Sequence, residues 1–116
     1  MLSAAAGGCA TSRVYDTSET ALLKAIPAAA ASVGFQGVEG HFNTASRTYF
    51  VDANLIFGFG YKAMRITWEP MPGLGRMVVT ADAYGGSPAT LYLWRYDDPD
   101  MELEFHRQLA IALGRP

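Results

Sequence analysis

Two histidines supply the side chains best suited to acid–base or metal chemistry in this sequence. His41 follows Gly40 near the end of an expected strand, and His106 comes four residues after Glu102 on an expected helix. Residues four apart share a helix face, so we expect Glu102 and His106 to form a surface pair. Neither histidine lies near a second ligand or a nucleophile in the sequence. The two side chains therefore predict no catalytic pair and no metal site.

An acidic run at residues 97–104 is the other group that suggests metal binding. It contains five of the eleven acidic residues, namely Asp97, Asp98, Asp100, Glu102 and Glu104. A calcium loop needs a glycine and a defined ligand spacing, and the run has neither. Carboxylates at the start of a helix are stabilised by its unpaired N–H groups and its dipole. We therefore expect this run to lie at a helix N-terminus.

Two other motifs match known signatures only in their letters. Ser87 lies in Gly-Gly-Ser-Pro, which lacks the pattern and the strand-to-helix context of a nucleophile elbow. Residues 58–63 have the spacing of a dinucleotide-binding fingerprint, but that motif must open a helix, and here a strand is expected to follow. We expect a glycine-rich hairpin turn there, no cofactor, and a protein that is not an enzyme.

Composition narrows the class of protein. The 116 residues are 50% hydrophobic and 17% charged, which is typical of one folded domain. A net charge of −2 gives no basic surplus for nucleic acid. The single cysteine excludes an internal disulfide and a cysteine-rich zinc site.

Aromatic residues recur on one side of the last expected strand, at 91–96. Tyr92, Trp94 and Tyr96 alternate with leucines, so they should share one face of the sheet. Rings on an open sheet face suit a protein partner, because tyrosine and tryptophan are favoured at interfaces. The alternative is that these rings pack across the outer face against neighbouring side chains.

A second aromatic group lies at the expected hairpin turn and consists of Phe57, Phe59 and Tyr61. Exposed apolar clusters of this kind often mark contact with a partner or a membrane. If the strands instead continue through this region, the same side chains would cover one end of the core. Both aromatic groups are predicted partner-binding residues.

The first twelve residues carry no charge and are almost all small. Within them, Ala6-Gly7-Gly8-Cys9 resembles the lipobox of bacterial lipoproteins, although Ala6 stands where leucine is usual and only eight residues precede the cysteine. The resemblance implies lipidation of the Cys9 sulfur and an anchor in membrane lipid, since several acyl chains together hold a protein on a bilayer. In the enterobacterial form of this family, Ala10 after the cysteine implies the outer membrane, facing the periplasm. The alternative is a free cysteine in a flexible tail.

Two helices are predicted, one near each end of the chain. Asp16 with Glu19 three residues later resembles a capping box, and Gly34 should end the helix that follows. Asp98 should cap a C-terminal helix that has Pro99 at its first position. The expected apolar stripe of that second helix is Met101, Phe105, Leu109 and Leu113.

Between the helices, alternating apolar and polar residues predict strands separated by turns. The alternation is clearest at 64–69 and 77–82, where every second side chain belongs to one apolar face. The expected strands are 35–42, 48–57, 64–69, 77–82 and 91–96, with a loop at 70–75.

These elements predict an α+β fold, because two amphipathic helices need an apolar surface and the sheet offers one. We expect a two-layer sandwich: a four- or five-stranded, mostly antiparallel sheet with an N-terminal and a C-terminal helix on one face. Residues 1–13 would form a signal-like or tether segment, and 14–116 a single domain. The reverse face of the sheet would then be open to a partner.

The order of these elements, with the lipobox-like segment and Gly34-Phe35, resembles small uncharacterised bacterial envelope lipoproteins. It is also distantly similar to the lipoprotein accessory subunits of the outer-membrane barrel-assembly machinery. The resemblance implies a location in the cell envelope and a binding or scaffolding role, and it assigns no catalytic residue. We therefore expect a non-enzymatic envelope lipoprotein that binds an envelope protein or a second copy of itself.

Two alternatives remain open. The first is a structural subunit of a larger assembly, in which an ordered N-terminal tail packs on other chains. The second is a carrier of a small apolar ligand in a cavity between helices and sheet. The side chains expected to line that cavity are Met64, Trp68, Met77 and Phe105.

Overall fold

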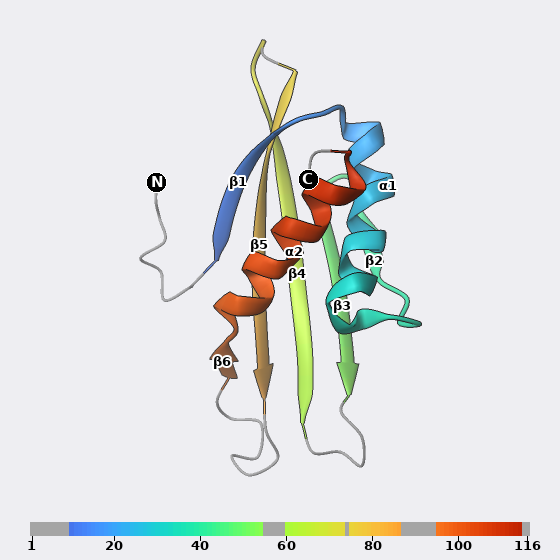
Figure 1. Cartoon of the computed structure of the whole chain (residues 1–116), viewed down its shortest axis with the longest axis vertical. Helices are drawn as coiled ribbons and strands as arrows, with labels where there is room; N and C mark the ends of the chain where they lie inside the picture. Colours follow the sequence, from blue (N-terminus) through green and yellow to red (C-terminus); the bar gives the residue numbers. More distant parts are fainter. Residues whose placement is uncertain (1–9, 55–59, 74, 87–94, 115–116) are drawn as a thin grey trace.

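The computed structural model describes residues 10–54, 60–73, 75–86 and 95–114 (Figure 1). The first elements along the chain are a strand, a helix and a short π-helical segment: β1 (Thr11–Asp16), α1 (Glu19–Ala30) and η2 (Ala31–Phe35). The remaining strands are β2 (His41–Asn43), β3 (Thr48–Asn54), β4 (Tyr61–Met71), β5 (Arg76–Gly86) and β6 (Arg95–Asp97). Helix α2 (Pro99–Ala112) follows them.

The described strands form one antiparallel sheet in the order β1-β5-β4-β3-β2, and β6 also pairs with β5. β1 pairs with residues 76–81 of β5, and β6 pairs with residues 84–86. β4 occupies the opposite edge of β5 along its whole length. The two short strands therefore share one edge of β5, and the sheet is five strands wide, within the predicted width.

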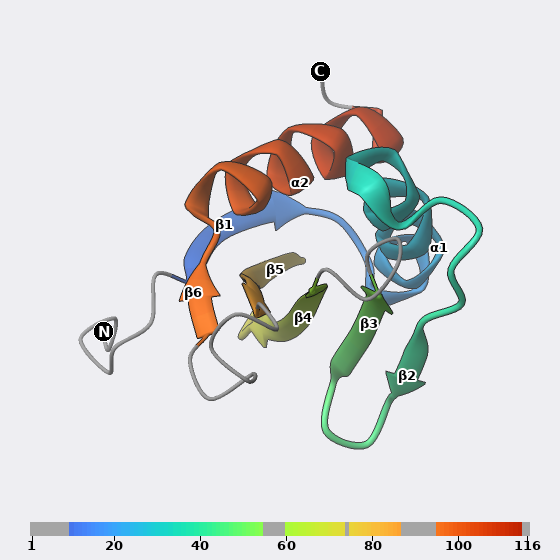
Figure 2. The same ribbon diagram turned by 90° about the horizontal axis from the view of Figure 1, so that it is seen from below.

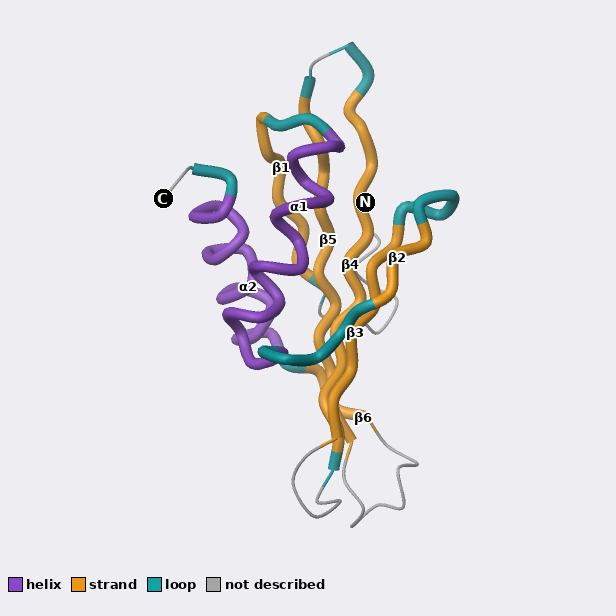
Figure 3. The backbone as a smooth tube through the Cα atoms, turned by 90° about the vertical axis from the view of Figure 1, so that its right-hand side faces the viewer, coloured by secondary structure: helices purple, strands orange, loops and turns teal. Residues whose placement is uncertain are grey.

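Helices α1 and α2 cover the same face of the sheet, as Figures 2 and 3 show. Helix α1 lies on the side of β3, and α2 lies over β1 and β5. Residues from both helices and from the inner side of the sheet form one hydrophobic core. The predicted α+β sandwich, with an N-terminal and a C-terminal helix on one face, is confirmed.

Alternation along the central strands separates the buried face from the outer face. In β4, Met64, Ile66 and Trp68 are at most 2% exposed, whereas Arg65 and Glu69 are exposed. Burying one large apolar side chain is worth about 1.5–3 kcal/mol. The alternation predicted for 64–69 therefore decides which side of the sheet faces the helices.

Helix α2 begins as predicted. The Asp98 side chain accepts a hydrogen bond from the N–H of Met101 at 3.1 Å, and Pro99 is the first helical residue. Phe105, on the predicted apolar stripe, is fully buried. Gly114, with a φ of 81°, follows the last turn, where a glycine often ends a helix.

Helix α1 begins two residues later than the capping-box pattern predicts. Its cap is Ser18, whose Oγ accepts a hydrogen bond from the N–H of Ala21 at 3.1 Å. The predicted Asp16 cap is wrong, because Asp16 ends β1 and is paired with β5. Gly34, with a φ of 117°, lies at the end of the helical run as predicted.

Strand β1 is the largest addition to the predicted elements. It takes in residues 11–13, which the sequence pattern assigned to the tether segment, so the sheet begins at Thr11. Of its six residues only Tyr15 is buried, and the strand therefore has no alternating apolar signal. What positions β1 in the sheet is backbone pairing with β5, whose paired residues are 60 to 70 positions away in the chain.

The predicted strand at 35–42 is wrong for most of its length. Phe35 is 1% exposed at the end of η2, and strand pairing begins only at His41. Gly37 has a φ of 78°, which interrupts an extended chain. At Gly40 the ring of Tyr49 lies so close that a Cβ would collide with it.

The β4–β5 hairpin is longer than the predicted loop at 70–75 allows. The strands continue to Met71 and resume at Arg76, and Gly73 in the turn has a φ of 72°. The hairpin projects beyond the rest of the sheet in Figure 1. Beyond Thr67, β4 pairs with β5 but no longer with β3, so Pro70 interrupts no ladder on that side.

Candidate functional site

The outer face of the sheet, opposite the two helices, is arranged in rows that cross the strands. One half of this face, the hydroxyl half, consists of Ser12, Thr80, Thr67 and Thr48, which are cross-strand neighbours in that order. The other half, towards β6, carries aromatic and charged side chains. This aromatic half consists of Phe50, Asp52, Tyr61, Ala63, Arg65, Asp82 and Tyr84.

Partly exposed rings line the aromatic half. The Arg65 guanidinium lies 5.8 Å from the centroid of the Phe50 ring, which is within range of a cation–π interaction. Ala63 is only 1% exposed although it points away from the helices, and Tyr84 is its cross-strand neighbour. Phe50 and Tyr84 are each partly exposed. Rings beside an arginine are the side chains that protein interfaces favour.

Tyr61 is the predicted partner-binding residue whose side chain the structure describes. Its ring lies over Gly86 on the neighbouring strand, where a Cβ would collide with it. Tyr96 lies in β6, and its backbone is paired with Gly85. The other predicted binding and lipidation residues, Phe57, Phe59, Tyr92, Trp94 and Cys9, lie outside the described residues, as does Ser87.

Both connections that carry the predicted aromatic residues are attached to one end of the sheet. Asn54 is opposite Tyr61, Tyr61 is opposite Gly86, and Gly86 is opposite Arg95. Residues 55–60 connect the first pair, and residues 87–94 connect the last pair. The two segments therefore begin and end in a single cross-strand row beside the aromatic half.

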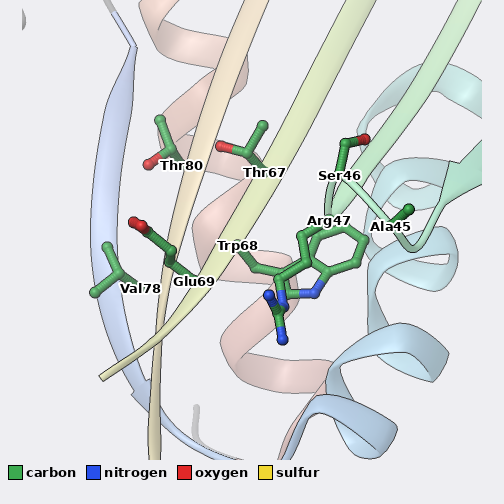
Figure 4. A pocket seen from close by; sticks show the side chains of 8 residues that line it. All are labelled: Ala45, Ser46, Arg47, Thr67, Trp68, Glu69, Val78 and Thr80. Carbon is green, nitrogen blue, oxygen red and sulfur yellow. The ribbon is translucent and has the colours of Figure 1, made fainter. Parts of the chain in front are cut away.

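A hollow of about 330 Å³ lies over the hydroxyl half (Figure 4). Thr67 and Thr80 belong to its lining, and the β2–β3 turn contributes Ser46 and Arg47. The remaining lining residues are Ala45, Trp68, Glu69 and Val78. Hydroxyl groups both donate and accept hydrogen bonds, so this hollow suits polar groups better than an apolar ligand.

Arg47 ties the β2–β3 turn to helix α1. It has a φ of 53° and is the non-glycine residue with a positive φ among those described. Its Nε donates to Glu19 Oε2 at 3.1 Å, and Trp68 Nε1 donates to the same oxygen at 2.7 Å. The Trp68 hydrogen bond, followed by Arg47, holds the pKa of Glu19 below its ordinary value. The turn beside the hollow is thus fixed by a shared carboxylate.

The predicted surface pair of Glu102 and His106 is wrong, because both residues are fully buried. Each is hydrogen-bonded to β1 instead, across the interface between α2 and the sheet. Glu102 Oε1 accepts from Thr11 Oγ1 at 2.7 Å, and Glu102 Oε2 accepts from the N–H of Ala83 at 2.9 Å. We call Thr11, Tyr15, Glu102 and His106 the polar cluster.

Both ring nitrogens of His106 are engaged in this polar cluster. Nδ1 lies 2.7 Å from the Tyr15 hydroxyl, and Nε2 lies 2.8 Å from the carbonyl oxygen of Thr11. The Tyr15 hydroxyl also lies 3.2 Å from the backbone oxygen of His106, to which it can donate. The two rings stack with an interplanar angle of 14°. The cluster therefore satisfies a buried histidine completely.

Burial shifts the titration of all three ionisable groups in the polar cluster. Desolvation raises the pKa of Tyr15 to about 12, so its hydroxyl keeps its proton. Desolvation lowers the pKa of His106 and raises the pKa of Glu102. The carboxylates of Asp82 and Asp97 raise the pKa of Glu102 further, against the hydrogen bonds from Ala83 and Thr11. Perturbed groups of this kind also occur at functional sites.

The structure also places His41, the turn that contains Gly60, and the residues predicted to line a cavity. His41 is exposed in β2, and a strand follows Gly60, as the hairpin prediction requires. Met64, Trp68, Met77 and Phe105, predicted to line an apolar cavity, all belong to the buried core. In the described part of the chain, no three His, Cys, Asp or Glu side chains are grouped to hold a metal ion.

None of the described helices is long and apolar enough to span a membrane. The chain matches no protein-family model, no curated protein and no solved structure.

Sequence reasoning missed Thr11 and Tyr15 as members of the polar cluster. The available signal was local: Arg13-Val14-Tyr15 contains two residue types with high strand propensity. That signal predicts a short strand without saying that Tyr15 meets a histidine 91 residues later.

Proposed function

We propose that this protein is a non-enzymatic bacterial cell-envelope lipoprotein that binds a protein partner through the aromatic half of its outer sheet face. The Cys9 sulfur would carry the lipid, and the outer membrane, facing the periplasm, would be its site. The partner would be another envelope protein or a second copy of the chain. No cofactor or metal takes part.

The observation that carries this proposal is the arrangement of the aromatic half. Phe50, Tyr61 and Tyr84 are partly exposed on a sheet whose helices lie on the opposite face. Arg65 contacts Phe50 and adds a cation to the same surface. Asn54, Gly86 and Arg95, which flank the segments that hold the other predicted binding residues, lie in one cross-strand row with Tyr61. Tyrosine, phenylalanine and arginine are enriched in interfaces, where they bury much area with little loss of conformational entropy.

The short spacing between Cys9 and the sheet limits how far the domain could lie from a lipid on Cys9. Thr11 is the first residue of β1 and is hydrogen-bonded to α2 through its hydroxyl and its carbonyl oxygen. Two residues of extended chain span about 7 Å at most. A lipid on Cys9 would therefore keep the start of β1 close to the bilayer, with no flexible linker between them.

Cross-linking in native membranes tests the binding face. We expect the Tyr61→Ala and Arg65→Ala variants to lose most of the cross-linked partner that the wild-type chain captures. Thr80→Ala, on the hydroxyl half of the same face, is the matched control and should capture it normally. Melting curves must first show that all three variants are folded. Unchanged capture by both aromatic-half variants would contradict this face as the binding site.

Mass spectrometry of the protein from its native membrane tests the tether. We expect an N-terminus at Cys9 that carries acyl chains, and we expect Cys9→Ser to leave the protein unacylated and outside the membrane fraction. An uncleaved, unmodified Cys9 would overturn the tether and leave the binding face to be judged by cross-linking. A stable stoichiometric complex without acylation would instead favour the structural-subunit alternative.

A further inference from the structure

Strand β1 is attached to the domain with little help from apolar burial. Four of its six residues are exposed, and only Tyr15 is buried. Its backbone is paired with β5 on one side. Its contacts with α2 include the hydrogen bonds of the polar cluster, from Thr11 to Glu102 and from Thr11 and Tyr15 to His106, and the stacking of Tyr15 on His106. A terminal strand held in this way depends on the protonation of the groups that bind it.

The hydrogen bonds of His106 place one proton and leave the other position open. The carbonyl oxygen of Thr11 can only accept, so the facing Nε2 must carry a hydrogen. In the neutral ring Nδ1 accepts from the Tyr15 hydroxyl, whereas in the protonated ring Nδ1 would donate to the Tyr15 oxygen and Tyr15 would donate to the backbone oxygen of His106. The cost of the second proton is therefore a positive charge on a fully buried side chain whose hydrogen-bond partners are all neutral.

We infer that the polar cluster is an acid-sensitive latch: protonation of His106 loosens β1 from α2 while the central strands β3 and β4 stay folded. This inference stands on the geometry of the cluster and does not depend on the proposed lipid tether or on the binding face. It assigns a regulatory role to a histidine that lies outside the proposed binding surface.

The charges around His106 favour release of β1 once the ring is protonated. From β1 the ring faces Tyr15, the carbonyl of Thr11 and, at longer range, Arg13, whose positive charge lowers the pKa of His106. Glu102 lies one turn earlier on α2, but its two oxygens accept from Thr11 and Ala83. A buried imidazolium would thus meet a like charge on β1 without a hydrogen-bonded carboxylate.

Glu102, the second attachment of β1, does not release the strand in acid. It faces Thr11 on β1, Asp82 on β5 and Asp97 on β6, and burial raises its pKa. A protonated carboxyl group can still accept from the N–H of Ala83 through one oxygen and donate to the hydroxyl of Thr11 through the other. The release of β1 in acid is therefore assigned to His106 and not to Glu102.

Amide exchange measured by NMR as a function of pH tests the latch. Between about pH 7.5 and about pH 5, we expect protection factors in residues 12–16 to fall about tenfold or more. Protection in 64–68 should hold over the same range. The imidazole nitrogen resonances of His106 should change with the same midpoint as the loss of protection. The full chain is used throughout.

A matched pair of glutamine variants isolates the cause. In His106→Gln, the amide oxygen can accept from Tyr15 and the amide nitrogen can donate to Thr11, so the contacts persist without a titrating group. We expect this variant to keep β1 protected at about pH 5. His41→Gln removes the other histidine, which is exposed, and should release β1 as the wild-type chain does.

Three results would overturn the inference. They are protection in 12–16 that does not change with pH, equal loss of protection in 64–68, or release of β1 in His106→Gln at the wild-type midpoint. If His106→Gln does not fold, Tyr15→Phe decides the matter, since it removes one bond and leaves the histidine. It should lower protection of β1 already at about pH 7.5, and unchanged protection there would also count against the latch.

Discussion

The carboxylate of Glu102 accepts a hydrogen bond from the backbone N–H of Ala83 at 2.9 Å, in the gap between β1 and β6. Residues 76–81 of β5 pair with β1 and residues 84–86 pair with β6, so Ala83 pairs with neither strand. Its carbonyl oxygen also accepts from helix α2, through the N–H of Asp98 at 2.9 Å. Glu102 and Asp98 therefore supply the hydrogen-bond partners that a neighbouring strand would otherwise give to Ala83. This explains why a carboxylate is buried at this position.

Replacing Glu102 by alanine should destabilise the fold by about 2–4 kcal/mol, because the buried N–H of Ala83 and the hydroxyl of Thr11 both lose their hydrogen bonds to the carboxylate. Glu102→Gln should cost less than half as much, since its amide can accept from the N–H and donate to the hydroxyl. Urea unfolding at neutral pH measures both variants. Equal losses for alanine and glutamine would show that the two hydrogen bonds contribute little.

Tyr15→Phe should lower the free energy of unfolding by about 1–3 kcal/mol, because it leaves Nδ1 of the buried His106 without a donor. The phenylalanine ring keeps the apolar packing of Tyr15, so the change isolates the hydroxyl. Tyr49→Phe is the comparison in β3, where the hydroxyl lies against Gly40. A loss for Tyr15→Phe no larger than that for Tyr49→Phe would contradict the role given to the hydroxyl.

The sequence predicts the sandwich because its central strands carry their burial pattern in every second residue. Met64, Ile66 and Trp68 are apolar and buried, and Asp98 with Pro99 starts α2 by local chemistry alone. The formation of these elements depends on residues that are close together in the chain. They can therefore be predicted from the sequence before the fold is known.

The polar cluster could not be predicted in the same way. Glu102 and His106 have the spacing of an exposed helix pair, and only the gap at Ala83 and the position of Tyr15 explain why they are buried. β1 gives no periodic signal, since one of its six residues is buried. These features depend on contacts between residues that are far apart in the sequence. The alternation of residues predicts which side chains lie on the outer face of the sheet. Their division into a hydroxyl half and an aromatic half depends on strand register, which alternation does not give.

The free energy of unfolding should respond to acid through two opposing groups. The pKa of His106 is lowered in the fold, so its contribution is present above its ordinary value of 6.5 and is lost as the pH falls. The pKa of Glu102 is raised above 4.5, so its contribution is present in acid and is lost as the pH rises. Between about pH 6.5 and 4.5, His106→Gln should therefore lose less stability than the wild-type chain, and Glu102→Gln should lose more. Urea unfolding at several pH values measures both, and identical profiles would contradict the assignment.

The Glu19 carboxylate, at the start of α1, should give a separate acid response. Its pKa is lowered by the Trp68 hydrogen bond and by Arg47, so its contribution is present above 4.5 and is lost as the pH falls further. Glu19→Gln should lower the melting temperature at neutral pH and flatten the loss below about pH 4.5. The indole N–H resonance of Trp68 should titrate in the wild-type chain and not in the variant. A resonance that does not move with pH would exclude this hydrogen bond as the sensor.

Gly86→Ala should move the ring of Tyr61 without unfolding the domain. A Cβ at residue 86 would collide with the far edge of that ring, and a side chain in that position can swing away at a cost of about 1 kcal/mol. Gly73→Ala is the matched control, because its Cβ meets nothing within 4 Å although its φ of 72° makes the change strained. If the aromatic half binds the partner, Gly86→Ala should reduce cross-linking and shift the ring resonances of Tyr61, whereas Gly73→Ala should do neither. If the ring of Tyr61 is displaced and cross-linking is still normal, the partner does not contact Tyr61.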